Sequence, residues 1–498
     1  MKTYHIGLDF GTYQTKACVY NIENNLHEFF KFPQNKTFFL PSMVGIKADS
    51  RFVYGITEST TCNSCYYYFK IAAAEDEEFY TETFDTTNTS HSSLYKNEEF
   101  YPFSPEFLSV IYICNVLFTI KENYMGKASS DKAIKGGFLN KLFSSNAKGE
   151  DVRFTIQLGI PTEWSQIKNL RRKRKFENIL LIAELLQKEY KTHEAFLNAT
   201  SQELSNNVKS IYGLNTFSSS KDFDDLLNSK GISVFPETGA GLTFIVKTRQ
   251  LLPGYYAIMD IGGGTTDISF FSVEVGNSIK YLASESYIIA ANNVYKHLAS
   301  QVSSIVALHE TERQVQNAIS SGEWKNNPQL IDALQKVNKD LKKMVYKLFN
   351  KRIYHFRPGM VNKYNDQPII MYGGGSRLPA IDNGTILIHD NGSPTSITIP
   401  TASLEKQQIE RYAAGINILP EDRSWEKDLS VLVVALGLSY IKPQSFADWF
   451  GEDEYQPKDS KPKKSMGIAR WNQETGTTVA HPFNEDRYLW DVLASKWL

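Results

Sequence analysis

The stretch AIMDIGGGTTDISFF, Ala257–Phe271, places three consecutive glycines and two threonines between two aspartates and flanks them with apolar residues. Glycine loses more backbone freedom on folding than any other residue, so a run of three glycines beside a strand is expected where something approaches the main chain closely. Glycine-rich turns expose backbone N–H groups that converge on anions. We therefore expect a phosphate group to bind here.

A second stretch near the N-terminus has the same pattern. HIGLDFGTYQTKACVYN, His5–Asn21, contains an apolar strand that ends in Asp9, a turn with Gly11 and Thr12, and a second apolar strand. Two such hairpins, about 250 residues apart, indicate the first elements of the two halves of a duplicated architecture. An aspartate at each strand end can hold a hydrated Mg²⁺, and a threonine hydroxyl can donate to phosphate oxygens. The alternative is a pair of tight hairpins whose glycines serve only positive φ angles.

A third glycine cluster, Gly373–Gly375, follows the apolar residues of PIIMYGGGSRLPAI. The glycines would let the backbone pass close to a base and ribose, and the planar guanidinium of Arg377 can lie on an adenine ring. A strand-to-helix turn with Pro379 at the first helical position is compatible with the same residues.

The composition is that of an ordinary folded protein. A chain of 498 residues with 42% hydrophobic and 22% charged residues suggests two or more domains. The formal net charge is −1, so nothing global indicates a nucleic-acid or membrane-surface protein. The longest apolar run, at 107–120, is too short to span a bilayer and is expected to form a buried helix. Four cysteines fit a reducing cytoplasm, and Cys62 and Cys65 form a lone C-x-x-C whose zinc or redox role is the minor alternative.

The three glycine motifs together carry a family resemblance. GLDFGT, MDIGGGTTD and YGGGSRLP, in this order and spacing, resemble the phosphate-1, phosphate-2 and adenosine motifs of the actin-like ATPase superfamily. Within it they look most like the 70-kDa heat-shock chaperone family. The resemblance covers roughly residues 1–445. It implies an α/β protein with a two-lobed actin-like ATPase fold, built from duplicated RNase-H-like domains with a helical subdomain insertion, that closes on ATP or ADP with Mg²⁺.

The resemblance also implies roles for individual residues. Asp9 and Asp260 would orient the waters of the metal, and Lys70 would stabilise charge on the γ-phosphate with Glu237 nearby; these four are the expected catalytic residues. A surface lysine beside a tyrosine cluster is the alternative for Lys70, and Asp267 is read as structural. The expected nucleotide-binding residues are Gly11, Thr12, Tyr13, Gly262, Gly263, Gly264, Thr265, Thr266, Gly373, Gly374, Gly375, Ser376 and Arg377.

The same resemblance predicts the domain boundaries. Lobe I is expected at 1–250 and lobe II at 251–442, with a helical tip at about 287–365. Chaperones of the family continue with a peptide-binding β-sandwich and a helical lid. The charged, proline-containing tail at 443–498 is expected to be too short to form them.

Two polar insertions are expected in lobe I, near 126–151 and 190–232, as surface excursions. Ahead of the second, the basic run Arg171–Lys175 begins a helical segment. Five adjacent cations wrap a helix rather than line one face, so a solvated helix start is expected. Contact with a nucleic acid or an acidic partner is the alternative.

The leading hypothesis is a cytoplasmic MgATPase with slow turnover and no membrane role. Its nucleotide state would open and close the lobes and so act on a partner protein. An actin-like filament-forming ATPase and a small-molecule kinase of the superfamily are the alternatives. The matches at Lys70 and Glu237 argue against a filament, and no segment indicates the second-substrate pocket with an aspartate base that a kinase needs.

Overall fold

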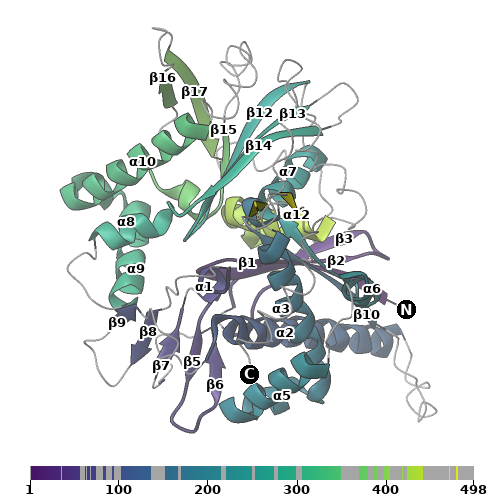
Figure 1. The fold of residues 1–498 in the computed structure, drawn as a ribbon. Helices are drawn as coiled ribbons and strands as arrows, with labels where there is room; N and C mark the ends of the chain where they lie inside the picture. Colours follow the sequence, from purple (N-terminus) through teal and green to yellow (C-terminus); the bar gives the residue numbers. More distant parts are fainter. Residues whose placement is uncertain are drawn as a thin grey trace.

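A computed structural model of the chain shows a mixed α/β fold built around two large β-sheets (Figure 1). The expected insertion beyond residue 135 and the expected helical tip beyond residue 348 lie outside the described residues. The described residues are 2–34, 36–55, 62, 64–67, 69–74, 82–85, 92–94, 103–135, 152–165, 170–214, 220–248, 253–273, 279–298, 305–348, 369–379, 385–389, 396–403, 418, 423–440, 470–471 and 478–479.

The first sheet is centred on the N-terminal strand, β1, which pairs antiparallel with β2 and parallel with β10. Seven consecutive residues of β1 are buried, as expected for a strand covered on both faces. The strand order is β11-β10-β1-β2-β3, and the short β4 also pairs with β2. The strands are β1 (Lys2–Phe10), β2 (Gln14–Asn21), β3 (Leu26–Phe29), β4 (Leu40–Pro41), β10 (Val152–Ile160) and β11 (Ile232–Pro236).

The second sheet has the order β14-β13-β12-β15-β17-β16. The series β3-β2-β1-β10-β11 of the first sheet and β14-β13-β12-β15-β17 of the second have the same pairing pattern. In each series the first two pairings are antiparallel and the next two are parallel. The two hairpins noticed in the sequence, β1–β2 and β12–β13, therefore occupy equivalent places. The strands are β12 (Gly254–Ile261), β13 (Thr266–Val273), β14 (Ile279–Tyr287), β15 (Ile369–Tyr372), β16 (Thr385–His389) and β17 (Ser396–Ser403).

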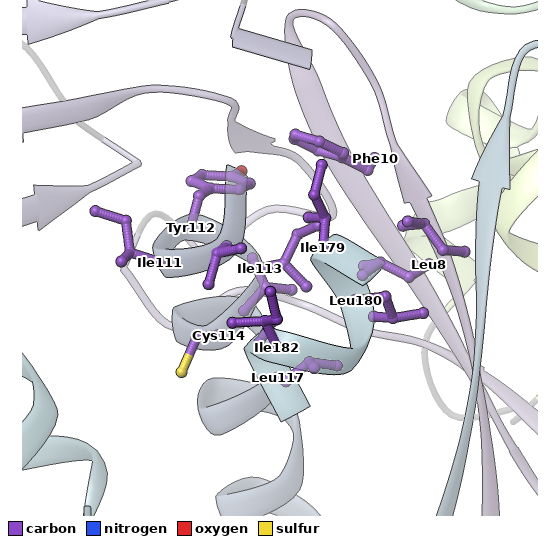
Figure 2. Packing of buried hydrophobic residues seen from close by; sticks show 14 of the residues in the cluster. Leu8, Phe10, Ile111, Tyr112, Ile113, Cys114, Leu117, Ile179, Leu180 and Ile182 are labelled. Carbon is purple, nitrogen blue, oxygen red and sulfur yellow. The ribbon is translucent and has the colours of Figure 1, made fainter. Parts of the chain in front are cut away.

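Helices α2 (Pro105–Lys135) and α3 (Leu170–Glu189) form much of the core beside the first sheet. Figure 2 shows Leu8 and Phe10 of β1 close to side chains of both helices. The buried helix expected at 107–120 is confirmed. Helix α2 continues unbroken to Lys135, so the excursion expected from residue 126 begins as helix, and its place on the surface stays a prediction. No helix in the described part of the chain is long and apolar enough to cross a membrane.

The surface excursion expected at 190–232 is wrong for the described residues of this segment. They include three helices, most of whose apolar side chains join the main core, and Phe196 and Leu204 are fully buried. The reason is an amphipathic pattern: Leu204, Val208 and Ile211 recur at helical spacing while the serines and asparagines fill the other face. The helices are α4 (His193–Asn198), α5 (Ser201–Leu214) and α6 (Ser220–Lys230).

The basic run at the start of α3 is engaged inside the protein. Lys175 is buried and its Nζ lies 3.2 Å from Glu106 Oε1. Arg174 pairs with both carboxylate oxygens of Asp224. The prediction of a solvated helix start is therefore wrong for Arg174 and Lys175, and contact of this run with a nucleic acid stays a prediction.

A small sheet has the order β6-β5-β7-β8-β9, and α1 (Phe69–Ala74), the helix that carries Lys70, lies between β7 and β8 in the chain. Cys65 lies in β7, and Cys62 lies three residues before it in the sequence. Both are buried free thiols, and burial raises the pKa of Cys65 to about 12. A raised pKa disfavours the thiolate that metal binding or redox chemistry requires. The strands are β5 (Val44–Ile46), β6 (Phe52–Tyr54), β7 (Ser64–Tyr66), β8 (Glu82–Asp85) and β9 (Ser92–Leu94).

Helices α7 (Glu237–Thr248) and α12 (Leu429–Tyr440) join the two sheets. They cross at Gly437, where a Cβ atom would overlap the carbonyl oxygen of Ala240. The sequence of α12 is apolar all round, which suits a helix buried on every side. Although the sequence assigns α12 to the second half, it contacts β1 and β2 as well as β15 (Figure 1). One core cluster accordingly contains residues of both sheets and of both helices.

The helical tip expected at about 287–365 is helical over its described part. Its apolar side chains, including Leu334 and Leu341 of α10, pack into a core shared with β12 and β13. The helices are α8 (Ala291–Leu298), α9 (Ile305–Ser321) and α10 (Pro328–Leu348). In the tail, the described residues form a short hairpin of β18 (Arg470–Trp471) and β19 (Thr478–Val479).

Candidate functional site

The turns that follow β1 and β12 line one cavity of about 300 Å³. Glycine turns, charged side chains and the residues after β15 meet there, although they are distant in the sequence. Of the residues singled out from the sequence, those lining the cavity are Asp9, Gly11, Thr12, Tyr13, Lys70, Glu237, Asp260, Gly262, Gly263, Thr265, Gly373, Gly374, Gly375 and Arg377.

Three expected nucleotide-binding residues do not line the cavity. Thr266 is fully buried, and its hydroxyl donates to the carbonyl of Ile289. The Ser376 hydroxyl donates to the carbonyl of Gly373 at 2.7 Å. Gly264 is buried against neighbouring side chains. These three residues shape the turns from behind rather than face the cavity.

The backbone of the first turn is held by Ser42, which follows β4. The Ser42 hydroxyl donates to the carbonyl of Gly11 at 2.7 Å, and its amide donates to the carbonyl of Tyr13 at 2.7 Å. In a trans peptide the next N–H points opposite to the carbonyl, so the amides of Thr12 and Gln14 point away from Ser42. Both of these residues line the cavity. Such an arrangement of amides is typical of a backbone anion site.

The second turn is held in the same manner by the start of α8. The carbonyl of Gly262 accepts from the amide of Ala291 at 3.2 Å, and that of Gly263 accepts from the amide of Asn292 at 2.9 Å. The amide of Gly262 closes the hairpin on the carbonyl of Thr265 at 2.9 Å. Both glycine turns therefore have carbonyls fixed by a neighbouring segment, an arrangement that is compatible with anion binding by their amides.

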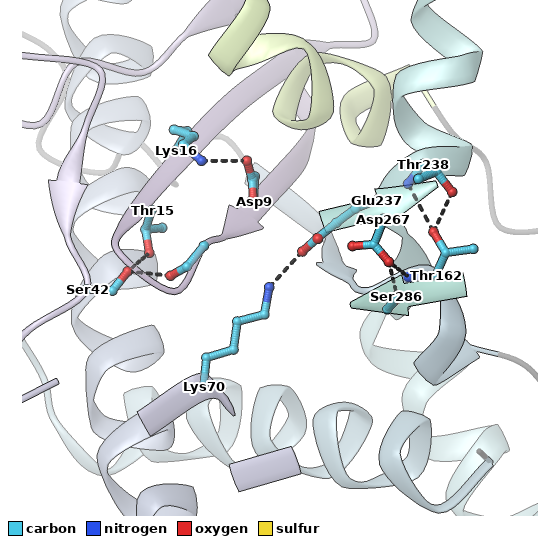
Figure 3. Close-up of polar contacts among 11 residues, drawn as sticks. Asp9, Thr15, Lys16, Ser42, Lys70, Thr162, Glu237, Thr238, Asp267 and Ser286 are labelled. Carbon is cyan, nitrogen blue, oxygen red and sulfur yellow. Dashed lines mark hydrogen bonds and ion pairs between the residues drawn. The ribbon is translucent and has the colours of Figure 1, made fainter. Parts of the chain in front are cut away.

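Lys70 and Glu237 form a buried ion pair, with Lys70 Nζ 2.7 Å from Glu237 Oε1 (Figure 3). Lys70 is 3% exposed, so the alternative of a surface lysine is wrong. Glu237 is placed by its position at the junction of β11 and α7, at the same edge of the first sheet as Asp9. A carboxylate in the first turn of a helix is also favoured by the helix dipole.

Lys16 is a cavity residue that the sequence reasoning missed. It stands opposite Asp9 in the β1–β2 pairing, and its Nζ lies 2.9 Å from Asp9 Oδ2 (Figure 3). The signal was present as the one charged residue of the strand Gln14–Asn21, but only the register of the hairpin shows that it faces the aspartate.

The carboxylates of the site outnumber its lysines. Burial raises the pKa of Asp260 well above its ordinary value, and the charges of Glu237, Asp267 and Asp9 add to the rise. Burial likewise raises the pKa of Glu237, against the lowering effect of Lys70. A cation near Asp9 and Asp260 would relieve this repulsion. Two carboxylates would leave most of the coordination positions of such a cation to water, which suits Mg²⁺.

Asp267 lies behind the site. It is 1% exposed, and its Oδ1 accepts from the amide of Thr162 at 3.2 Å and from the hydroxyl of Ser286 (Figure 3). Burial raises its pKa to about 7. These contacts agree with the structural role expected for Asp267, since they tie β13 to the segment after β10.

The third glycine cluster closes the cavity on the side of the second sheet. Gly373 has φ 86°, and a Cβ atom there would overlap Asp260 Oδ1, so only glycine fits. The guanidinium of Arg377 donates to the carbonyl of Lys427 at 2.8 Å and pairs with Asp428 at 3.1 Å. These contacts fix Arg377 to the segment before α12 while it lines the cavity.

Residues of α8 and α9 complete the wall, and the sequence reasoning named none of them. Tyr295 comes from α8, while Glu312, Gln316, Ile319 and Ser320 come from α9. Gln316 Nε2 donates to Glu312 Oε1 at 3.1 Å. Their helical spacing puts them on one face of α9, but nothing local in the sequence shows that this face meets the glycine turns.

Comparison with known proteins gives limited results. No family model matches the chain, and no curated protein matches it. Among solved structures it is similar to "pCBH ParM non-polymerisable quadruple mutant", an actin-like ATPase, at 15% identity and a TM-score of 0.36, over 75% of this chain and 89% of that chain. This similarity gives no support to the narrower resemblance to the 70-kDa heat-shock family.

Proposed function

We propose that the chain is a Mg²⁺-dependent ATPase of the actin-like kind, whose cavity takes ATP or ADP and whose motifs are nearest to those of the 70-kDa heat-shock family. One observation carries the proposal. Two equivalent hairpins, from sheets with the same five-strand pairing pattern, present their turns to one cavity that also contains the buried Lys70–Glu237 pair.

The polyphosphate would lie between the two turns. Backbone amides beside Thr12 and Gly263 would donate to phosphate oxygens, with the hydroxyls of Thr12 and Thr265 as further donors. Asp9 and Asp260 would hold the waters of the metal. When bound, Mg²⁺ would offset the negative charge that develops on the phosphate oxygens.

Hydrolysis would depend on the charged residues at the bottom of the site. The ammonium of Lys70 would stabilise the terminal phosphate, and the carboxylate of Glu237, already oriented by Lys70, would accept a hydrogen bond from the attacking water. Lys16 supplies a second buried cation beside Asp9. Positioning and electrostatics dominate phosphoryl transfer, so slow turnover is expected without further assistance.

The adenosine would lie at the other end of the cavity, between Gly373–Gly375 with Arg377 and the polar face of α9.

We propose lobes at 1–250 and 251–442 that move about the crossing of α7 and α12, so that closure on nucleotide is sensed by a partner protein. A pull-down in the presence of ATP and then of ADP tests this coupling. The coupling requires that a partner protein be retained with one of the two nucleotides and not with the other.

Release of phosphate from ATP tests the activity itself. The wild type should hydrolyse ATP slowly, and Lys70→Ala should abolish hydrolysis. Lys121→Ala is a matched control, because it removes a comparable lysine–glutamate pair, with Glu184, away from the cavity. Binding without hydrolysis in either protein would indicate a nucleotide sensor instead. An ATP-dependent pellet would favour a filament, and a phosphorylated metabolite a kinase.

A further inference from the structure

The two glycine turns approach each other closely, and the side chain of Tyr13 makes one of the contacts between them. Tyr13 belongs to the turn after β1, yet it packs against the core that includes Met259 and Ile268 of the second sheet. Its ring lies on the backbone of Gly263: a Cβ atom there would overlap Tyr13 Cδ2 and lie 3.1 Å from its Cγ. Glycine at position 263 is what allows this approach.

Both sides of the contact are held in place. On one side, Ser42 fixes the carbonyl of Tyr13 at 2.7 Å. On the other, the amide of Asn292 fixes the carbonyl of Gly263 at 2.9 Å. Packed contacts between fixed segments do not deform continuously, so the turns can separate only if the Tyr13 ring leaves the Gly263 backbone.

We propose that Tyr13 is a positioning residue that latches the two glycine turns together, and that nucleotide release requires this latch to open. The release part rests on the proposed function, because it places the phosphates between these turns. Tyr13 and Gly263 both line the cavity, so the latch lies beside the path that a leaving polyphosphate would take.

The neighbouring glycine supplies a matched control. A Cβ atom on Gly264 would lie 2.8 Å from Ile71 Cδ1 and 3.0 Å from Thr12 Cγ2, with Tyr13 not among its three nearest neighbours. Removing the Tyr13 ring should therefore relieve a side chain added at position 263 but not one added at position 264.

The first experiment measures dissociation of a fluorescent ADP analogue by stopped flow. Tyr13→Ala should release it about three to ten times faster, the factor expected when one aromatic contact is lost, and Tyr13→Phe should restore the wild-type rate. Because the proposed role of Tyr13 is to hold the turns, while hydrolysis is assigned to the Lys70–Glu237 pair, KM for ATP should change more than kcat. A wild-type release rate in Tyr13→Ala overturns the latch and leaves the proposed function standing.

The second experiment needs no nucleotide. Thermal unfolding is compared for Gly263→Ala, Gly264→Ala, and each combined with Tyr13→Ala. The loss of stability in Gly263→Ala should shrink in the Tyr13→Ala background, while that in Gly264→Ala should not. Equal, additive losses at both positions overturn the contact. If the contact holds but the wild type takes up no nucleotide, the proposed function fails and the release role fails with it.

Discussion

Replacing Lys70 by methionine tests the electrostatics of the site without reference to any ligand. The Lys70 and Glu237 side chains are 4% and 9% exposed, and their charged atoms lie 2.7 Å apart. Methionine keeps most of the volume of the lysine stem but leaves the Glu237 carboxylate buried without this partner. Removing one partner of a buried ion pair costs about 3–5 kcal/mol, so we expect a loss of this size in the free energy of unfolding at pH 8.

The loss should depend on pH in a definite direction. Burial already raises the pKa of Glu237 above its ordinary value of 4.5, and Lys70 lowers it, so losing Lys70 raises it further. An acid with a raised pKa binds its proton more tightly when folded, so its contribution is favourable at low pH and is lost as pH rises through the folded pKa. The defect of Lys70→Met should therefore be largest at pH 8 and should shrink as pH falls toward 5.

Urea unfolding followed by circular dichroism measures this effect. Lys70→Met combined with Glu237→Gln should recover much of the lost stability, because no charge of the pair then remains. Lys121→Met is the control, since its partner Glu184 is 17% exposed and keeps more access to water, so the loss of stability should be smaller than in Lys70→Met. Wild-type stability of Lys70→Met at pH 8, or a defect that does not change with pH, would refute the reasoning.

Two further predictions concern the framework. Burial lowers the pKa of His27 to about 3, so the wild type should lose stability as pH falls from about 6.5 toward 3. Between neutral pH and pH 5, urea unfolding should show that His27→Phe loses about 2 kcal/mol less stability than the wild type. The same dependence of stability on pH in both proteins would contradict this. Gly437→Ala should destabilise the protein by about 1–3 kcal/mol or more, because the added Cβ atom overlaps Ala240. Gly213→Ala places its Cβ atom in open space on α5 and should stabilise the protein by up to about 1 kcal/mol. Similar melting temperatures for both variants would contradict the close crossing of α7 and α12.

Local chemistry explains what the sequence could predict. A glycine turn between a strand-ending aspartate and a threonine is specified by adjacent residues, so Asp9 and Asp260 could be recognised without knowing the fold. Lys70 and Glu237 were reached only through the family resemblance, because 167 positions separate them. The structure brings all four to one cavity.

The features that could not be predicted from the sequence depend on tertiary packing, or were hidden because the composition of a whole segment was considered rather than its individual residues. The contact of Tyr13 with Gly263 and the facing of Glu312 toward the cavity require the relative placement of distant elements. The segment 190–232 looked polar by composition, but its helical period of apolar residues placed it in the core. Lys175 was grouped with the cationic residues next to it in the sequence. Successive residues of a helix face different directions, however, and the side chain of Lys175 is buried in the protein.

Calorimetric titration of the folded wild type with ATP and with ADP, in the presence and absence of Mg²⁺, measures whether the cavity takes up an adenine nucleotide with its metal. We expect uptake of both nucleotides with Mg²⁺ and binding at least about tenfold weaker when it is chelated or when Asp260 is replaced by asparagine. Asp260→Asn removes a charge from a crowded group of carboxylates and should remain folded, so its loss of binding would report on the site. A folded wild type that takes up neither nucleotide, or an Asp260→Asn variant that binds as tightly as the wild type, would contradict the account.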